Sequence, residues 1–279
     1  MILSPKVFLG GVSGDLGLDS VVLKTASPTL SAPESVMLWH AFRAISQAFS
    51  KDTRFERPLT HLSVGAMGEM AQLSGMLRTG GEVRLNDCCC GVGFLSLATA
   101  LLRGQKPTGT VGFDKDRTCE DPFHRARTLW KFNGSHEFRC QDVGDMSGVE
   151  HLISSQSVPT CNMAYSACDM ATDAILKSSA KCMLTPGSSF TSCVVAPCCY
   201  DFLSAHNPYP SVLENTDWIK LTGLAGSSDL RVSVASALTI DRIRALALKR
   251  EGVSVSIFPL TSHSLGGPKW AIVVKPKRS

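Results

Sequence analysis

One short stretch of the chain combines a carboxylate, three thiols and two closely spaced glycines. Asp87 is followed by three consecutive cysteines, of which Cys89 is the second, and Gly91 and Gly93 then lead into the apolar segment 94–102. Glycine lets the backbone approach a ligand closely, and a helix that begins at residue 94 offers free N–H groups at its start. The pattern indicates a ligand-binding turn between a strand and a helix, although a Gly-x-Gly pair alone fits many α/β proteins.

Two further carboxylates follow segments that are expected to be strands. Asp114 ends the apolar run 109–114, and Asp142 follows the segment 137–141. In dinucleotide-type folds, an acid at the end of the second strand accepts hydrogen bonds from ribose hydroxyls, which favours Asp114 over Asp116. Asp142 is a candidate contact for an adenine amino group. The alternative for each is a solvated acid at a strand terminus.

Two later segments place cysteines where further strands are expected to end. Residues 164–173 read Ala-Tyr-Ser-Ala-Cys-Asp-Met-Ala-Thr-Asp, and residues 196–200 read Ala-Pro-Cys-Cys-Tyr. The side chains that could flank a reaction there are Cys168, Asp169, Cys198, Cys199 and Tyr200. Cys198 follows a proline and could add covalently to a base as a thiolate. The alternative is that Cys198 and Cys199 are small buried residues that shape a pocket.

Alternating strand and helix patterns connect these motifs. Strands are expected at 82–87, 109–114, 137–141, 162–167, 190–196, 253–259 and 270–274. Helices are expected at 65–78, 94–102, 119–132, 147–155, 170–180 and 240–250. The segment 200–230 is rich in Pro, Asn, Ser and Gly and is predicted to be a long loop. The sequence therefore predicts an α/β fold: a Rossmann-like, seven-stranded, mostly parallel sheet with helices on both faces and a C-terminal antiparallel hairpin.

The chain is expected to divide into a helical N-terminal extension, residues 1–58, and an α/β domain, residues 59–279. In the extension, Leu38, Phe42 and Ile45 recur at helical spacing, which predicts a helix docked against the core. The whole chain has 279 residues, 44% of them apolar, which is enough for one large domain. No apolar run approaches the ~20 residues that a membrane span needs, so no membrane association is expected. The net charge of +4 permits an RNA partner without requiring one.

The cysteines bear on the compartment and on metal binding. Eleven of them occur in a long chain, mostly in apolar contexts, which predicts free thiols in an intracellular reducing compartment, either the cytoplasm or the mitochondrial matrix. The clustered cysteines are adjacent and lack the two-residue gaps of a zinc knuckle, so no metal site is expected.

The combined motifs resemble a family of class I S-adenosylmethionine-dependent methyltransferases. That family carries Ala-Cys-Asp-x-Ala-Thr-Asp after the fourth strand and Ala-Pro-Cys-Cys-His after the fifth, and it is related to the acceptor-stem tRNA 2'-O-methyltransferases. Its first motif often reads Asp-x-Cys-Ser-Gly-Lys-Gly-Phe-Leu-Ser, similar to residues 87–96 here. The segments 243–248 and 263–269 also look like the family's C-terminal helix and turn. The resemblance covers residues 59–275.

The resemblance implies an enzyme that uses S-adenosylmethionine to methylate RNA, either tRNA or rRNA. The implied cofactor-binding residues are Asp87, Cys89, Gly91, Gly93, Asp114, Asp142 and Cys168. The implied catalytic residues are Asp169, Cys198, Cys199 and Tyr200. RNA is expected to meet the carboxyl edge of the sheet, the segment 200–230 and the basic residues Lys269, Lys275, Lys277 and Arg278.

Four polar residues of the family pattern are replaced in this chain, by Val92, Ser166, Tyr200 and Trp270. The replacements at 166 and 200 remove histidines, the side chains that titrate near neutral pH. Two functions therefore stay open. One is an active RNA methyltransferase, including a cytosine-5 enzyme that uses Cys198. The other is a catalytically weak or inactive subunit with a structural or assembly role in an RNA–protein particle such as a ribosome or mitoribosome. A small-molecule methyltransferase is a third class, without a positive signal.

Overall fold

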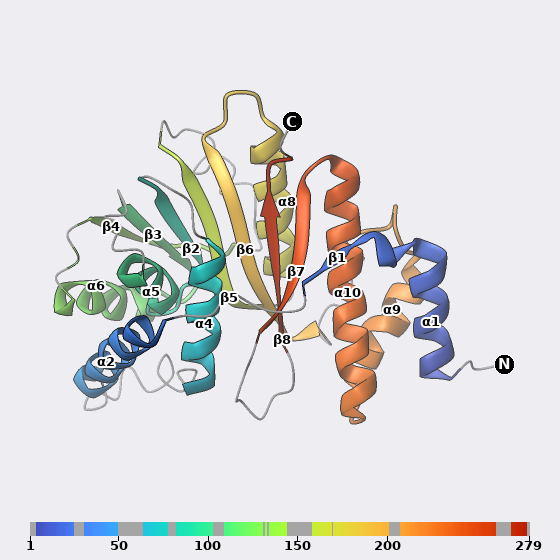
Figure 1. The fold of residues 1–279 in the computed structure, drawn as a ribbon, viewed down its shortest axis with the longest axis horizontal. Coiled ribbons are helices and arrows are strands. Elements are labelled where there is room, and N and C mark those ends of the chain that lie inside the picture. Colours follow the sequence, from blue (N-terminus) through green and yellow to red (C-terminus); the bar gives the residue numbers. More distant parts are fainter. Residues whose placement is uncertain are drawn as a thin grey trace.

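The computed structural model places one mixed sheet at the centre of the molecule, with helices on both of its faces (Figure 1). The residues it describes are 4–24, 31–49, 64–77, 82–102, 109–130, 132, 134–143, 158–168, 170–200, 207–260 and 269–277. The predicted Rossmann-like α/β fold is confirmed. Within the described residues, no helix is both long enough and apolar enough to cross a membrane.

The sheet has eight strands in the order β1-β7-β8-β6-β5-β2-β3-β4. Their bounds are β1 Val22–Leu23, β2 Arg84–Cys88, β3 Gly109–Asp114, β4 Ser135–Cys140, β5 Thr160–Cys168, β6 Phe190–Cys198, β7 Ser254–Leu260 and β8 Lys269–Lys275. Every neighbouring pair is parallel except the two that contain β8, which confirms the C-terminal antiparallel hairpin. The predicted count of seven was one too low. The extra strand, β1, has only two residues, too few to show a strand pattern in the sequence.

Helices cover the sheet in two groups (Figure 1). On one face lie α1 Pro5–Leu16, α8 Met170–Leu184, α9 Asn215–Ala225 and α10 Leu230–Glu251. On the other lie α2 Ala32–Phe49, α4 Val64–Met76, α5 Phe94–Leu102 and α6 Glu120–Leu129. Short 3-10 turns, η1 Leu18–Ser20 and η3 Arg117–Cys119, link some of these elements.

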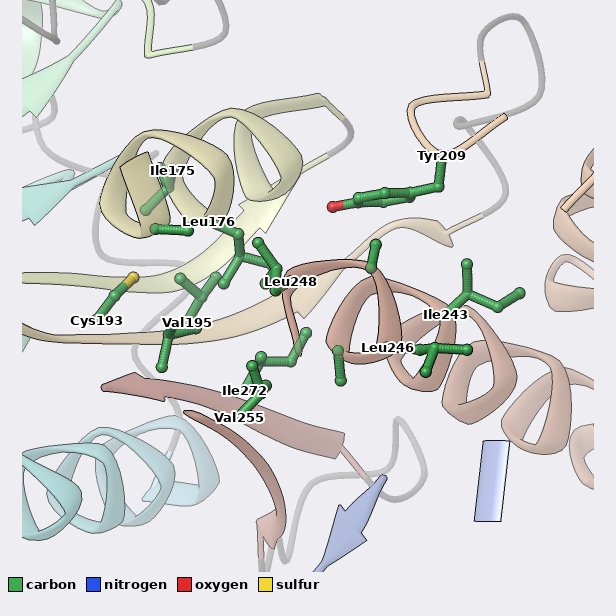
Figure 2. Close-up of a cluster of buried hydrophobic side chains, with 14 of the residues drawn as sticks. Ile175, Leu176, Cys193, Val195, Tyr209, Ile243, Leu246, Leu248, Val255 and Ile272 are labelled. Carbon is green, nitrogen blue, oxygen red and sulfur yellow. The ribbon is translucent and has the colours of Figure 1, made fainter. Parts of the chain in front are cut away.

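Each face of the sheet has its own apolar core, and β6 contributes to both. Cys193 and Val195 belong to the core under α8 and α10, which Figure 2 shows, whereas Val194 and Ala196 belong to the core under α4 and α5. Successive side chains of a strand point to opposite faces, so a strand that is buried on both sides reads as a continuous apolar run. This is why residues 190–196 could be predicted as a strand.

The chain reverses its direction of progress across the sheet between β2 and β5. After β2 it adds β3 and β4 on one side, and it then returns to add β5 and β6 on the other. Open α/β sheets bind ligands at such a switch point, outside the carboxyl ends of the strands. Cys88 and Cys168 end the two strands that meet here. The predicted motifs of both strands therefore lie at one edge.

The long loop predicted for residues 200–230 is wrong in part. Residues Asn215–Ala225 form α9, with Trp218, Leu221 and Thr222 buried at helical spacing. Polar and glycine residues around these three obscured the pattern. The helix predicted at 240–250 begins ten residues earlier, because Asp229 caps it by accepting the N–H of Arg231 at 2.9 Å.

Two other predictions concern the parts of the chain outside the described residues. The helix predicted at 147–155 lies outside them. The domain boundary at residue 58 also falls among residues that are not described and stays a prediction. On the N-terminal side of that boundary, β1 pairs with β7 and Phe42 of α2 packs edge-on against Phe94 of α5 at 5.3 Å between ring centroids. The described part of the N-terminal segment is therefore packed against the sheet and its helices.

Candidate functional site

The turn between β2 and α5 has the left-handed backbone that its glycines suggested. Gly91 and Gly93 have φ values of 51° and 75°, and Cys89, which is not a glycine, has a φ of 56°. A Cβ on Gly93 would lie 2.5 Å from Phe123 Cδ2 and 2.6 Å from Arg127 Nη1, so no side chain fits there. A Cβ on Gly91 would meet nothing within 4 Å. Gly93 thus closes the turn onto α6, whereas Gly91 leaves open space beside the backbone.

Asp114 ties the end of β3 to this turn. Its Oδ2 accepts the N–H of Gly91 at 2.8 Å, and its Oδ1 accepts the N–H of Asp116 at 2.9 Å. Each carboxylate oxygen has two acceptor sites, so both retain capacity for a further donor. The side chain is half-buried and reaches the same edge as the open face of Gly91. A half-buried carboxylate with spare acceptor sites, beside open backbone, fits the ribose of a nucleoside ligand.

Asp87 was predicted to bind the cofactor, and the structure places its side chain in the protein interior. It is only 1% exposed, and its Oδ2 accepts the N–H of Ser96 at 3.0 Å near the start of α5. Buried Arg127 donates to Ser96 Oγ at 2.6 Å and to Thr110 Oγ1 at 3.0 Å on the neighbouring strand. Asp87 therefore fixes the start of α5 to the end of β2.

Asp87 gives the protein a specific pH dependence. Burial raises the pKa of its carboxyl to about 6, although the hydrogen bond from Ser96 and the charge of Arg127 oppose the shift. The unfolded value is about 3.9, so protonated Asp87 stabilises the fold below about pH 4, and that contribution is lost as the pH rises through about 6.

We expect Asp87→Asn, which mimics the protonated form, to gain stability relative to the unmodified chain as the pH rises. Between about pH 4.5 and 7 the difference in free energy of unfolding should grow by roughly 1–2 kcal/mol, since one pKa unit corresponds to about 1.4 kcal/mol. Urea unfolding of both proteins at several pH values measures it. A difference that stays constant over this range would contradict the buried, proton-linked role.

Three cysteines meet at the ends of β5 and β6. Cys168 and Cys198 are register partners on these strands, and their Sγ atoms lie 3.0 Å apart. The Sγ of Cys199 is 3.5 Å from that of Cys168. Cys198 also donates to the backbone oxygen of Ser166 at 3.2 Å. The hydrogen bond with Cys168 and burial both raise the pKa of the Cys198 thiol, so the thiol and not the thiolate is favoured there.

The hydroxyl of Tyr200 is directed toward α10. Its hydroxyl donates to Asp241 at 2.7 Å, and the guanidinium of Arg244 lies 5.6 Å from its ring centroid. Arg244 in turn binds Asp173 through Nε and Nη2, at 2.8 and 2.9 Å, and Asp241 through Nη1 at 3.1 Å. The candidate catalytic Tyr200 is therefore part of a buried network between α8 and α10. Tyr200, which stands where the family pattern has a histidine, therefore hydrogen-bonds to another residue of the protein, Asp241.

A second polar group at the same edge was missed in the sequence. Tyr165 donates to Oε2 of Glu69 at 2.7 Å, and Lys269 approaches the same oxygen at 3.1 Å. Glu69 is fully buried, and its Oε1 has no hydrogen-bond partner within the described part of the chain. One signal could have revealed it: Glu69 is the only charged residue of α4. The group sits beside the cysteines, since Tyr165 and Cys168 share the end of β5.

The remaining predicted residues are dispersed. Asp142 is exposed just after β4, and Asp169 lies outside the described residues. Lys275 ends β8, opposite Ser254 at the start of β7, so it lies at the amino edge of the sheet. Lys277 follows two residues later, whereas Lys269 lies at the carboxyl edge. Arg278 is outside the described residues. The predicted basic surface is thus divided between the two edges.

Two cavities among the described residues lie away from this edge. One, of about 320 Å³, is lined by residues of α8, α10 and the segment before α9, including Lys177, Tyr209 and Arg250. The end of α10 leads into β7 at the amino edge of the sheet. Lys177 donates to the carbonyl of Pro208 at 2.7 Å, which uses one of the three N–H groups of its ammonium. We place the candidate site at the carboxyl edge of the sheet. There, Gly91 leaves open space beside the backbone, and the carboxylate of Asp114 can accept further hydrogen bonds.

Comparison with known proteins identifies the family of the chain. Residues 66–206, half of the chain, match the model of a family described as a methyltransferase domain. The chain belongs to this methyltransferase family. The Rossmann-like sheet is the fold that the resemblance to class I methyltransferases implied. No curated protein matches the sequence.

Three solved methyltransferase structures are similar to this chain at low sequence identity. TrmK of M. capricolum, in complex with S-adenosyl-homocysteine, is 7% identical, with 78% of this chain and 70% of that chain covered and a TM-score of 0.43. TYW2 of M. jannaschii, in complex with AdoMet, is 12% identical, with 77% and 76% covered and a TM-score of 0.42. A putative caffeoyl-CoA O-methyltransferase from Staphylococcus aureus is 7% identical, with 88% and 100% covered and a TM-score of 0.47.

Proposed function

We propose that this methyltransferase acts on RNA, either tRNA or rRNA, at the carboxyl edge between β2 and β5. The observation that carries the cofactor half of the proposal is the contact of Asp114 with the Gly91 N–H, which joins the two predicted cofactor motifs. The RNA half is supported by the strings at 164–173 and 196–200, which resemble the relatives of the acceptor-stem tRNA 2'-O-methyltransferases.

Different residues at this edge bind the cofactor and position the acceptor in this proposal. S-adenosylmethionine, when bound, supplies a methyl group activated by a positively charged sulfur. We propose that Asp114 holds the ribose and that the open face of Gly91 admits the rest of the donor. Cys168, Cys198 and Cys199 form the adjoining wall, where the acceptor must be held in line with the methyl group.

Few side chains at this edge could accept the proton that the acceptor loses when it is methylated. Positions 166 and 200 hold Ser and Tyr, and the Tyr200 hydroxyl is already committed to Asp241. An acceptor that needs no strong base, such as an amine, escapes this restriction. A carbon acceptor attacked through Cys198 would need a thiolate, and the raised pKa of Cys198 opposes that form. An amine of an RNA base is therefore the acceptor that the described residues favour.

A second function is favoured by the same Tyr200 contact. Because the side chain that replaces the family's histidine is bound into the protein interior, the fold can persist without catalysis. The chain would then serve as a weakly active or inactive subunit of an RNA–protein particle, and it would still bind S-adenosylmethionine.

The experiment that separates these functions is a transfer assay with methyl-labelled S-adenosylmethionine and the full chain. Total RNA, total protein and a small-molecule extract serve as parallel acceptors, and calorimetry measures cofactor affinity on the same preparation. We expect label in RNA that nuclease releases and protease does not.

Cofactor binding without label in any fraction would support the inactive subunit. Label in the protein or small-molecule fraction alone would reject RNA as the acceptor. A Cys198→Ala variant that still transfers at a similar rate would exclude covalent catalysis by Cys198, whereas complete loss in a folded variant would support it.

A further inference from the structure

We infer that Cys168, Cys198 and Cys199 form a binding site for a thiophilic metal ion, with Zn²⁺ as its representative. Their sulfur atoms all lie within 4.8 Å of one another, with two separations of 3.0 and 3.5 Å. Zn–S bonds of about 2.3 Å in a tetrahedron place ligand sulfurs roughly 3.7 Å apart. Both printed separations are somewhat shorter than that value, and shifts of less than about 1 Å would bring the three ligands to one ion.

The backbone explains how three thiols come together from two strands. Consecutive side chains of a strand normally point to opposite faces, so Cys198 and Cys199 should diverge. Cys199 instead has a φ of 52°, in the left-handed region, and its sulfur lies within 4.8 Å of that of Cys198.

A bulge in β5 completes the arrangement. The register between β5 and β6 shifts between Tyr165 and Ala167, and Ser166 within the bulge has a φ of 56°. Beyond the bulge, Cys168 lies directly opposite Cys198. Non-glycine residues in this backbone region cost free energy and cluster at functional sites. Both strained residues serve here to converge the thiols.

The chemistry of the three ligands fits a soft d10 ion. Thiolates select Zn²⁺ and Cu⁺ over Mg²⁺ and Ca²⁺, which prefer oxygen. Cys168 and Cys199 are exposed, so an ion can enter from solvent, whereas Cys198 is half-buried. On binding, each thiol that becomes a ligand releases its proton to solvent as its sulfur bonds to the ion. A tetrahedral ion would keep its fourth position for water or another ligand at this edge.

The spacing of cysteines along the sequence argued against such a site. The ligands lie on two strands, with Cys168 thirty residues before Cys198, and each strand alone lacks the usual zinc pattern. Only the pairing of β5 with β6 brings them together. The inference is independent of the RNA proposal, because it rests on the thiols alone.

The test is metal binding by the full chain, purified under reducing conditions and freed of metal by chelation. We expect calorimetry to show one Zn²⁺ per chain, and Co²⁺ to give thiolate-to-metal charge-transfer absorption. Cys168→Ser and Cys198→Ser should each weaken Zn²⁺ binding at least tenfold. Cys140→Ser is the matched control, since Cys140 is an exposed cysteine at the end of β4, and it should bind as the unmodified chain does.

Several outcomes would overturn the inference. Absence of Zn²⁺ binding by the reduced protein is one, and undiminished binding by folded Cys168→Ser and Cys198→Ser variants is another. Equal weakening by Cys140→Ser would show that the ion binds thiols without a defined site. Circular dichroism of each variant establishes that a loss of binding is not a loss of fold.

Discussion

Replacing Arg244 by methionine is expected to lower the free energy of unfolding by about 3–5 kcal/mol at neutral pH. Arg244, Asp173 and Asp241 are 1%, 4% and 0% exposed, so water cannot take the place of the missing guanidinium. Burial opposes the charge of Arg244, but its two carboxylate partners outweigh that effect and raise its pKa well above the usual value. The variant would keep two buried carboxylates without their cation. Urea unfolding followed by circular dichroism measures the loss.

Arg242→Met on the same helix is the matched control. The side chain of Arg242 is 15% exposed, but its partner Asp19 is 92% exposed, and an ion pair to such a solvated carboxylate contributes at most about 1 kcal/mol. Adding Asp173→Asn and Asp241→Asn to the Arg244→Met variant should restore part of the stability, because the uncompensated charges are removed. If Arg244→Met costs no more than Arg242→Met, the buried network is not a major source of stability.

The same network shows why the orientation of the Tyr200 side chain could not be predicted from the sequence. Ala-Pro-Cys-Cys-Tyr placed it correctly at the end of β6, next to the two cysteines. Its direction depends on Asp241, forty-one residues later on a helix whose start was misjudged. A motif fixes position along a strand, but the orientation of a side chain depends on partners that the fold supplies.

Elements with strong local patterns were predicted closely. The strand Gly109–Asp114 and the helix Phe94–Leu102 have the predicted bounds, because an acid ends the first and a glycine turn begins the second. The short strand β1 and helix α9 lacked such signals and were missed. Cross-strand features were also missed, since neither the convergence of Cys168 with Cys199 nor the pairing of Glu69 with Tyr165 leaves a fixed spacing in the chain.

Replacing Asp114 by alanine is expected to weaken binding of S-adenosylhomocysteine by roughly 10–100-fold. The basis is the loss of charge-assisted hydrogen bonds to the ribose hydroxyls, which contribute about 1.5–3 kcal/mol. The same carboxylate also accepts the N–H groups of Gly91 and Asp116, so the substitution could act by loosening the turn instead. Calorimetry with S-adenosylhomocysteine alone would not separate these causes.

A ligand that lacks the ribose hydroxyls separates them. If Asp114 binds the ribose, then Asp114→Ala should have little effect on the affinity for the 2',3'-dideoxy analogue, which the unmodified chain already binds weakly. If Asp114 only holds the turn, both ligands should lose affinity by the same factor. Asp116→Ala is the matched control, because its carboxylate accepts the N–H and hydroxyl of Thr118 within η3, and it should change either affinity by less than about twofold. Equal affinity of Asp114→Ala and the unmodified chain for S-adenosylhomocysteine would remove Asp114 from the cofactor site altogether.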